Sequence, residues 1–409
     1  EVKRLNEAGV MTIITDHHLA EKDLLPSGIV INPNHPECEY PFKEISGCGV
    51  AFKLIMALRK SFRETGVWNN ERPEPNLLNS LDLVALGTVA DMVSLVDENR
   101  ILTYHGLIVM NEKPRLSIKV LKRLKKVDTV ISSSLSFQFA PLLNASGRLQ
   151  DANIAVRFLL SEDLEEAENM ANILNCANLQ RREKETKMIE KAFIQCEIQK
   201  QFPALIITSP DFHEGINGIV ATRLVELFYK PVIVLTEKEE ILKGSGRSIP
   251  EIHLKSALSE CSDLLERFGG HASAAGCSLV KENLEEFRER FFAVCHKLIP
   301  NSSEPKLPID GLLKLPEITK IFVDQLNRLQ PFGEGNKEPI FAIDTPELPF
   351  KLIKKKHVKW EIKGDFDILG WNLAETFLQE TPSQLAVNLG FNEFRGSRKI
   401  QLTIQDSQI

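Results

Sequence analysis

The sequence lacks any Cys-x-x-Cys pair, and its seven cysteines are scattered singly along the chain. This spacing argues against a cysteine zinc site, and the odd count predicts reduced thiols rather than a disulfide framework. The sequence also lacks any apolar run that approaches the roughly 18 residues of a membrane-spanning helix. We therefore expect a cytoplasmic protein without a membrane span.

Positive charge is not in excess either. The chain has 50 Lys and Arg residues against 56 Asp and Glu residues, which gives a formal net charge of -6. Any binding of nucleic acid must therefore come from local basic clusters, because the global field does not attract a polyanion. Hydrophobic residues make up 43% of the chain, and its 409 residues suffice for two or three globular domains.

The first two predicted regions are an α/β domain and a long helix. Residues 1–161 alternate short apolar runs with helical patterns, which is typical of a parallel α/β sheet. Residues 162–200 are highly charged, contain no Gly or Pro, and repeat apolar residues at helical spacing. We expect a long connecting helix there, broken near 180–184, whose charges form a solvated face.

The last two predicted regions are a second α/β domain and a small β domain. Strands and helices alternate again over 201–300, with a helix expected at 254–268 before a glycine-rich segment. Turn-forming residues at 301–305 indicate a linker. From there to residue 409 the segments are short and strand-like, which predicts a small β-barrel or sandwich.

A carboxylate and two imidazoles follow directly on a short apolar run. The run covers residues 10–15, and the triplet is Asp16, His17 and His18. Buried parallel strands read as such runs, and ligands in open α/β sheets collect beyond the carboxyl ends of the strands. The triplet is therefore a candidate metal site, although a surface turn would explain these residues equally simply.

A second carboxylate, Asp91, ends the apolar helical stretch 83–90. By itself such a residue is more often a helix-ending surface acid than a ligand. A divalent ion would reverse that expectation, since carboxylate and imidazole ligands together suit Mn²⁺ and tolerate Mg²⁺. Two such ions about 4 Å apart can hold a hydroxide and a phosphoryl oxygen for in-line attack.

Four segments of small residues also carry arginine, serine or histidine. They cover 144–149, 213–223, 243–248 and 269–276. Glycines let backbone N–H groups approach an anion closely, and an arginine can bind a phosphate with two hydrogen bonds. A helix cap with a surface arginine explains the first segment equally well, and an incidental histidine in a glycine turn explains the last. The candidate substrate-binding residues are Asn144, Arg148, Arg223, Ser245, Arg247, Ser248, Gly270 and His271.

In this order the segments resemble the DHH phosphoesterase superfamily, and the match narrows to the RecJ family of single-strand-specific exonucleases. Residues 16–18, 87–91 and 144–149 are similar to successive motifs of the DHH catalytic domain. Residues 244–248 and 269–271 are similar to motifs of the associated DHHA1 domain.

The more specific sign is Leu329-Gln330-Pro331-Phe332-Gly333-Glu334-Gly335-Asn336, followed by Pro339 and Phe341. It is similar to the start of the family's OB-fold domain, which small DHH phosphatases lack. The resemblance thus implies an α/β protein: a DHH-type parallel-sheet domain, a long connecting helix, a DHHA1 α/β domain that binds substrate, and a C-terminal OB-fold β-barrel.

The resemblance also implies roles for the site residues. His17 and Asp91 would be metal ligands, Asp16 would orient its neighbour, and His18 would face the scissile phosphate. The cofactors would be two divalent ions, Mn²⁺ preferred or Mg²⁺. The activity would be 5′→3′ hydrolysis of single-stranded DNA to 5′-mononucleotides in repair and recombination. A single-strand-binding protein and a helicase would be the partners.

The C-terminal region carries its own candidate surface, Lys355, Lys356, Lys359 and Trp360. Lysines beside an aromatic ring are the combination that a single-strand-binding OB surface uses for phosphates and stacked bases. A sheet edge protected by lysines explains the same residues. The fold implied by the resemblance favours the nucleic-acid surface.

One departure from the family pattern affects the expected activity. Family members carry an aspartate-rich strand end and a further aspartate motif before the Asp-His-His triplet, and this chain has neither. We expect a fragment with an incomplete two-metal site, which would bind metal weakly by itself. The alternatives are a DHH phosphodiesterase acting on short oligonucleotides or cyclic dinucleotides, and a catalytically silent scaffold that binds single strands.

Overall fold

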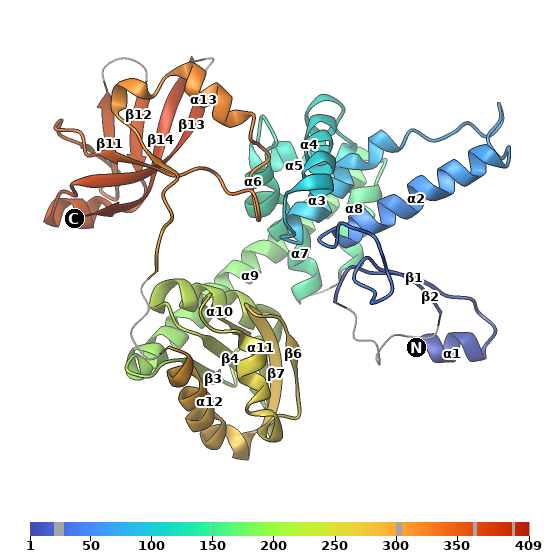
Figure 1. Cartoon of the computed structure of the whole chain (residues 1–409), viewed down its shortest axis with the longest axis horizontal. Coiled ribbons are helices and arrows are strands. Elements are labelled where there is room, and N and C mark those ends of the chain that lie inside the picture. Colours follow the sequence, from blue (N-terminus) through green and yellow to red (C-terminus); the bar gives the residue numbers. More distant parts are fainter. Residues whose placement is uncertain (20–27, 150, 300–304, 363–365, 395–396, 409) are drawn as a thin grey trace. The chain divides into compact units, whose positions relative to one another are not determined.

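The described residues form two compact units, 1–140 together with 307–409, and 141–306. Figure 1 shows the computed structural model with its elements labelled. The predicted linker at 301–305 falls largely on residues that the structure does not describe. No helix in the described part of the chain combines the length and apolar character needed to cross a membrane. The structure describes residues 1–19, 28–149, 151–299, 305–362, 366–394 and 397–408.

The chain begins with the short helix α1 (Val2–Glu7) and a parallel strand pair. Strand β1 (Ile13–Thr15) pairs in register with β2 (Ile29–Ile31), which confirms the predicted parallel arrangement. The expectation that this strand is buried is wrong for the described residues, because Ile13 is 57% and Ile29 is 51% exposed. Strands of a parallel sheet are normally covered on both faces.

Helices pack against one another in the rest of this region. Ser46 begins α2 by accepting a hydrogen bond from the backbone N–H of Gly49, and Phe52, Leu81 and Val84 form part of the core. A Cβ on Gly106 would lie 2.2 Å from the carbonyl oxygen of Leu81, so α3 and α4 require glycine where they cross. The helices are α2 (Gly47–Glu64), α3 (Leu81–Ala90), α4 (Asp97–Glu112), α5 (Leu116–Lys125) and α6 (Ser132–Ser134).

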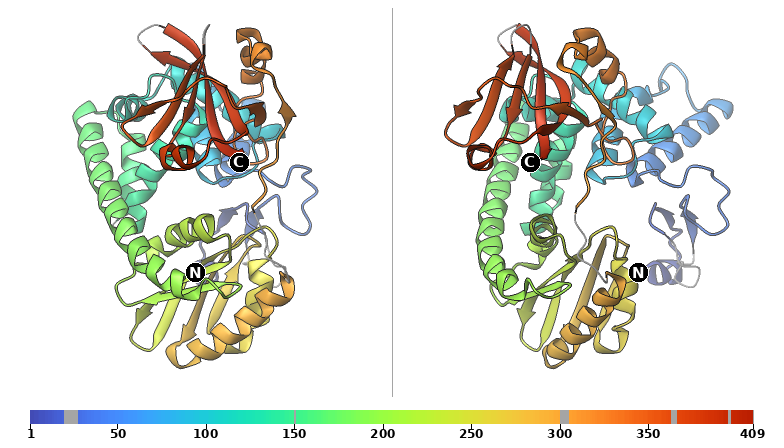
Figure 2. Two further views of the ribbon diagram at one scale, coloured as in Figure 1. Left: turned by 90° about the vertical axis from the view of Figure 1, so that its left-hand side faces the viewer. Right: turned by 60° about the vertical axis from the view of Figure 1, so that its left-hand side comes forward.

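The same unit contains the C-terminal barrel, drawn mainly in red in Figure 2. Its strands follow the order β10-β11-β12-β14-β13-β9-β8. Neighbouring strands are antiparallel except for the parallel pairs β12–β14 and β8–β9. This arrangement confirms the predicted small barrel. Its elements are β8 (Gly311–Leu312), α13 (Lys320–Asn327), β9 (Phe341–Asp344), β10 (Lys351–Ile353), β11 (His357–Ile362), β12 (Phe366–Gly370), α14 (Ala374–Gln379), β13 (Gln384–Phe394) and β14 (Ser397–Gln408).

The loop after α13 contacts the N-terminal helices directly. The backbone N–H of Leu95 donates to the carbonyl oxygen of Glu334 at 2.7 Å. The guanidinium of Arg100 donates to the carbonyl oxygens of residues 328–330 at 3.0 to 3.2 Å. These bonds attach the start of the barrel to the turn that follows Asp91.

The second unit is organised along one long helix. Helix α9 (Leu164–Gln199) begins at Asp163, whose side chain accepts from the N–H of Glu166 at 2.8 Å, and it continues without interruption. The predicted break near 180–184 is therefore wrong. The predicted solvated face is also wrong at Arg181, which is 7% exposed. Most of α7 (Ala140–Leu149) and all of α8 (Asn153–Leu160) belong to this unit as well.

A mixed sheet in the order β3-β4-β5-β7-β6 completes the second unit. One face packs on α9 and α10, and the other on α11 and α12 (Figure 1). The helix expected over 254–268 ends at Ser259, because Arg267–Gly270 pairs with β7 as a strand instead. The elements are β3 (Leu205–Ser209), α10 (Glu214–Phe228), β4 (Val232–Lys238), β5 (Ile241–Arg247), α11 (Leu254–Ser259), β6 (Arg267–Gly270), β7 (Ala274–Val280) and α12 (Leu284–Leu298).

Candidate metal centre and phosphate-binding residues

The Asp-His-His triplet turns tightly at the end of β1. Asp16 Oδ1 accepts hydrogen bonds from the backbone N–H of His17 at 2.7 Å and from that of His18 at 3.2 Å. The same oxygen lies 2.8 Å from Nδ1 of His18. Partial burial raises the pKa of Asp16, but the hydrogen bonds from His18 and His17 outweigh it and lower the pKa below its usual value. Asp16 is therefore an anionic group that orients His18.

His17 turns toward Asp91. Its Nε2 lies 3.2 Å from Asp91 Oδ2, and Asp91 directly follows the last residue of α3, as the sequence indicated. Small residues make this approach possible. A Cβ on Gly87 would lie 2.2 Å from Sγ of Cys48, so α2 and α3 require glycine where they meet, one turn before Asp91.

Two asparagines after β2 hold the triplet and were not singled out from the sequence. The side-chain NH₂ of Asn32 donates to the carbonyl oxygen of His18 at 2.9 Å. That of Asn34 donates to the carbonyl oxygen of His17 at 2.7 Å. The sequence could have indicated both asparagines, because polar residues that follow the neighbouring strand of a parallel pair lie at the same edge of the sheet as the triplet.

The donor set fits a divalent ion. Ligand atoms of Asp16, His17 and His18 lie within 4.8 Å of one another. Asp91 adds a second carboxylate, with its Oδ2 close to the His17 Nε2. Imidazole and carboxylate together are typical ligands of Mn²⁺, and the carboxylate oxygens also suit Mg²⁺. His17 Nε2 and Asp91 Oδ2 lie close enough together for both to contact one ion, which makes these two residues the candidate ligands.

In the second unit the structure brings three arginines together. Arg148 donates from Nη1 to the carbonyl oxygen of Gly215 at 2.9 Å, and Arg247 lies against Gly218. Desolvation lowers the pKa of Arg148, and so does the positive charge of Arg181. Desolvation likewise lowers the pKa of Arg247, with a further contribution from Arg148. These like charges repel one another, which favours a bound anion among them.

Arg181 is the member of this cluster that sequence analysis missed. Its guanidinium donates to Asn178 Oδ1 at 3.1 and 3.2 Å and to Glu185 Oε2 at 2.7 Å. Glu185 supplies one negative charge beside the three positive charges of Arg148, Arg181 and Arg247, so the cluster keeps an excess of positive charge. The many charged residues of the long helix hid Arg181, because the sequence pattern does not show which positions a neighbouring element covers.

The remaining candidates in this unit differ in what they contact. Arg223 pairs with Glu226 on an exposed part of α10, at 2.8 Å. The hydroxyl of Ser248 donates to the carbonyl oxygen of Ile252 at 2.9 Å. A Cβ on Gly270 would lie 2.4 Å from the carbonyl oxygen of Ala274, so this glycine is required by the β6–β7 hairpin. Asn144 and His271 are exposed, and Ser245 lies within β5, half-buried.

The candidate OB surface needs a correction. Trp360 is 1% exposed and belongs to the barrel core, where its Nε1 donates to the carbonyl oxygen of Leu348 at 2.9 Å. In β11 the side chains alternate between the two faces, and Trp360 faces inward. Lys359 points outward but pairs with Asp367 at 2.9 Å and Glu361 at 3.3 Å. Lys355 and Lys356 are exposed, as expected.

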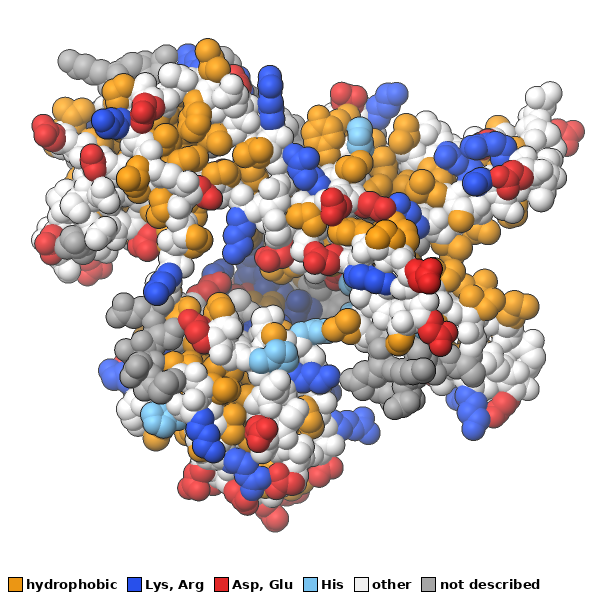
Figure 3. All heavy atoms as spheres, in the orientation of Figure 1, with side chains coloured by type: hydrophobic (Ala, Val, Ile, Leu, Met, Phe, Trp, Pro, Cys, Tyr) orange, Lys and Arg blue, Asp and Glu red, His pale blue; other side chains and the backbone are white. Residues whose placement is uncertain are grey.

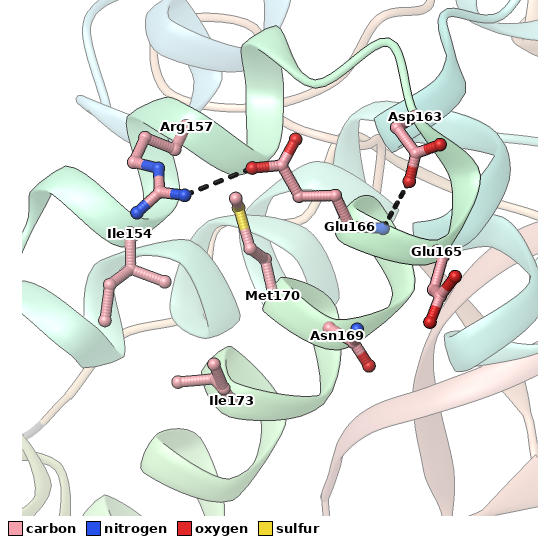
Figure 4. A pocket seen from close by; sticks show the side chains of 8 residues that line it. All are labelled: Ile154, Arg157, Asp163, Glu165, Glu166, Asn169, Met170 and Ile173. Carbon is pink, nitrogen blue, oxygen red and sulfur yellow. Dashed lines mark hydrogen bonds and ion pairs between the residues drawn. The ribbon is translucent and has the colours of Figure 1, made fainter.

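A pocket of about 440 Å³ lies between α8 and α9, apart from all of these candidates (Figure 4). The Arg157–Glu166 ion pair, at 3.1 Å, and the Asp163 cap close one side of it. The ion pair joins the two helices, and the cap stabilises the start of α9. The pocket is lined by Ile154, Arg157, Asp163, Glu165, Glu166, Asn169, Met170 and Ile173.

On the face of the molecule drawn in Figure 3, Lys and Arg side chains are interspersed with Asp and Glu side chains.

Family models match three parts of the chain. The DHH family, N-terminal domain, matches residues 1–88, the DHHA1 domain matches 200–297, and the RecJ OB domain matches 309–406. The single-stranded-DNA-specific exonuclease RecJ of Dickeya dadantii is 39% identical over 422 residues, covering 97% of this chain and 73% of that protein. The protein of the same name from Bacillus subtilis is 36% identical, covering 100% of this chain and 52% of that protein.

Solved structures agree with these matches. The crystal structure of RecJ in complex with Mn²⁺ from Thermus thermophilus superposes with a TM-score of 0.83 at 29% identity, over 100% of this chain and 59% of that chain. The complex with Mg²⁺ gives 0.79 at 28% identity, over 98% of this chain and 60% of that chain. The order of the matched domains is the order predicted from the sequence, and the chain belongs to the RecJ family.

Proposed function

We propose that this protein is a metal-dependent single-stranded-DNA exonuclease that hydrolyses phosphodiester bonds from a 5′ end and releases 5′-mononucleotides. The observation that carries the proposal is the convergence of His17 Nε2 and Asp91 Oδ2, 3.2 Å apart, beside a His18 that Asp16 orients. The relatives named above as single-stranded-DNA-specific exonucleases support it, and so do the Mn²⁺ and Mg²⁺ in the structures of RecJ from Thermus thermophilus. DNA repair and recombination are the processes in which we propose that this activity is used.

The side chains of the triplet and of Asp91 have different roles in the proposed hydrolysis. His17 and Asp91 would hold a divalent ion, which when bound activates a water molecule and stabilises negative charge on phosphoryl oxygens. Asp16 accepts a hydrogen bond from Nδ1–H of His18, so the other ring nitrogen, Nε2, is the one that can contact a phosphate. Asn32 and Asn34 fix the backbone of the triplet and thereby the directions of both imidazoles.

Arg148, Arg181 and Arg247 would bind phosphates of the single strand, including the 5′ phosphate. Charge-assisted hydrogen bonds from arginine to phosphate are short and strong, and partial desolvation strengthens them further. The cluster supports exonuclease action because a fixed anion site can hold the end of a strand. The OB domain favours a polymeric substrate over a dinucleotide or a short oligonucleotide, since a small-molecule phosphodiesterase has no need for it.

The described ligands are too few for two ions. Asp16 Oδ1 already accepts three hydrogen bonds, which leaves His17, Asp91 and few other groups for coordination. This chain spans 73% of the Dickeya relative and 52% of the Bacillus relative. We propose that full activity needs further carboxylates from a longer form of the protein, and that the exposed Ile13 and Ile29 are covered there. A cytoplasmic location, and a single-strand-binding protein and a helicase as partners, remain part of this proposal.

The test is digestion of 5′-phosphorylated single-stranded and duplex DNA with Mn²⁺. The proteins compared are this chain, an upstream-extended form, and the extended form with His18→Ala. We expect mononucleotides from the single strand only, made by the extended form and lost with His18→Ala. If the extended form binds single strands but cleaves nothing, the chain is a scaffold. Cleavage restricted to dinucleotides would make it a small-substrate phosphodiesterase.

A further inference from the structure

The turn that follows Asp91 has an unfavourable backbone conformation. Asp91 directly follows α3, and the next residue, Met92, has φ +59°, in the left-handed region, although it is not a glycine. Such a conformation persists where the surrounding structure holds it in place. The side chain of Met92 is 71% exposed and contributes little to this. The position of the Asp91 carboxylate therefore depends on the contacts of the residues that come next.

The entry loop of the barrel, residues 329–336, holds this turn from one side. The backbone N–H of Leu95 donates to the carbonyl oxygen of Glu334 at 2.7 Å. Gly335 approaches the turn so closely that a Cβ there would lie 2.9 Å from Cβ of Ser94. The segment that distinguishes this chain from small DHH phosphatases thus contacts the turn of a candidate metal ligand.

Asn99 holds the same turn from the other side. It is fully buried in α4, and its side-chain NH₂ donates to the carbonyl oxygen of Ser94 at 3.0 Å and to that of Glu44 at 2.7 Å. Its Oδ1 accepts no hydrogen bond from any described residue. Since a buried oxygen without a partner lowers stability, asparagine is unfavourable here except for the two bonds that its NH₂ group donates.

Glu44 belongs to the segment that fixes the backbone of His17. The side-chain NH₂ of Asn34 donates to the carbonyl oxygen of His17 at 2.7 Å and to that of Lys43 at 3.1 Å. Lys43 directly precedes Glu44. Hydrogen bonds therefore connect the backbone of His17, through the two asparagines, to the turn after α3. They fix the relative position of the two candidate ligands, which come from segments far apart in the sequence.

We propose that Asn99 and the entry loop are positioning groups of the metal centre, which hold Asp91 Oδ2 beside Nε2 of His17. This inference rests on the proposed function, whose metal ion it shares. Groups that orient metal ligands from outside the coordination shell typically change metal affinity by about 10- to 100-fold. The barrel thus supports the metal centre through its entry loop, independently of any contact with DNA.

The experiment is titration with Mn²⁺, in which electron paramagnetic resonance measures the free ion. It is made on this chain and on its upstream-extended form. Asn99→Ala and Gly335→Ala should each weaken Mn²⁺ binding by about 10-fold, the lower end of the range, because both ligands remain. Arg100→Ala removes the bonds to the carbonyl oxygens of residues 328–330 and should weaken binding by a smaller factor. Because Arg100 is partly exposed, this variant tests the loop even if Asn99→Ala does not fold.

A second readout separates positioning from stability. The stabilisation that a bound ion adds to the folded chain depends on its concentration and dissociation constant. A variant that merely loses stability therefore keeps the increase in unfolding midpoint that a fixed Mn²⁺ concentration produces. Asn99→Ala should lose most of this increase.

The matched control for Asn99→Ala is Asn111→Ala on the same helix. The side chain of Asn111 donates to the carbonyl oxygens of Leu107 and Val130, both at 2.9 Å, and it lies about 18 Å further along α4. This variant should lose stability but bind Mn²⁺ as tightly as the unaltered chain.

The control for Gly335→Ala is Gly66→Ala, at another glycine with positive φ and open space around its Cβ position. It too should leave Mn²⁺ affinity unchanged.

A His17→Ala variant separates failure of this inference from failure of the proposed function. If His17→Ala abolishes Mn²⁺ binding but Asn99→Ala, Gly335→Ala and Arg100→Ala bind the ion as tightly as the controls, the entry loop only attaches the barrel and the inference is wrong. If neither form of the chain binds Mn²⁺ through His17, the proposed function itself loses its metal centre.

Discussion

Arg247 lies directly against Gly218. A Cβ at position 218 would come within 2.8 Å of Arg247 Nη2, the far end of a flexible side chain. Gly218 lies within α10, where alanine is favoured over glycine by about 1 kcal/mol. The glycine is therefore unfavourable for the helix itself, and its contribution is the space that it leaves for the guanidinium of Arg247.

Gly218→Ala should displace Arg247 without unfolding the protein. We expect the midpoint of thermal unfolding to stay level or rise, while affinity for a 5′-phosphorylated oligonucleotide falls. Arg247→Ala should cost more, on the order of 1.5 to 3 kcal/mol for the lost charge-assisted hydrogen bond. Anisotropy with 5′-phosphate and 5′-hydroxyl oligonucleotides measures both effects. If the unaltered chain binds both oligonucleotides with equal affinity, Arg247 does not bind the terminal phosphate.

Arg181→Leu should strongly destabilise the second unit. It would leave Glu185, a nearly buried carboxylate, without the guanidinium that donates to it at 2.7 Å. Breaking such a pair from one side costs about 3 to 5 kcal/mol, whereas replacing both partners by apolar residues is often neutral. Urea unfolding of Arg181→Leu and of Arg181→Leu with Glu185→Leu tests this. A double variant as unstable as the single one would show that Arg181 stabilises through packing instead.

Gly335→Ala should weaken the attachment of the barrel to the helical region. Gly335 has φ +69°, and a Cβ there would lie 2.9 Å from Cβ of Ser94. The expected destabilisation is about 1 to 3 kcal/mol from the backbone conformation, and the clash with Ser94 adds to it. Gly66→Ala is the matched control, because Gly66 has φ +73° and nothing within 4 Å of its Cβ position. Calorimetric unfolding of both variants separates the two contributions, and equal losses of stability would show that the approach to Ser94 does not matter.

Glu98 should make stability depend on acid pH. Partial burial raises its pKa, but hydrogen bonds from Lys53 and Tyr40 outweigh this and lower the pKa below its usual value. The stabilisation is therefore present at pH values above the unfolded pKa of about 4.3 and is lost as pH falls through the folded pKa.

Glu98→Gln should lower the free energy of unfolding at pH 7 by about 1 kcal/mol, because the pair is partly screened by solvent. At pH 3 the variant and the unaltered chain should be closer in stability. Glu64→Gln is the control, since Glu64 meets Lys60 at 3.9 Å on an exposed face. Urea titrations at both pH values measure the difference. A loss of stability for Glu98→Gln that persists undiminished at pH 3 would contradict the electrostatic explanation.

The local sequence by itself determined the elements that depend on short-range pattern. The Asp-His-His triplet at the end of a strand and Asp91 at the end of a helix follow from periodicity and residue type. The family and the order of its domains followed from motif order along the chain. These features need no knowledge of what packs against them.

Only the tertiary structure decided which side chains are covered. Trp360 and Lys359 are neighbours in the sequence, yet one is in the barrel core and the other forms ion pairs on the surface. Arg181 joins Arg148 because α7 and α9 approach there, which no spacing along α9 reveals. Burial depends on contacts between segments far apart in the chain, so the pattern of one segment gives its period but not which of its faces meets a neighbour.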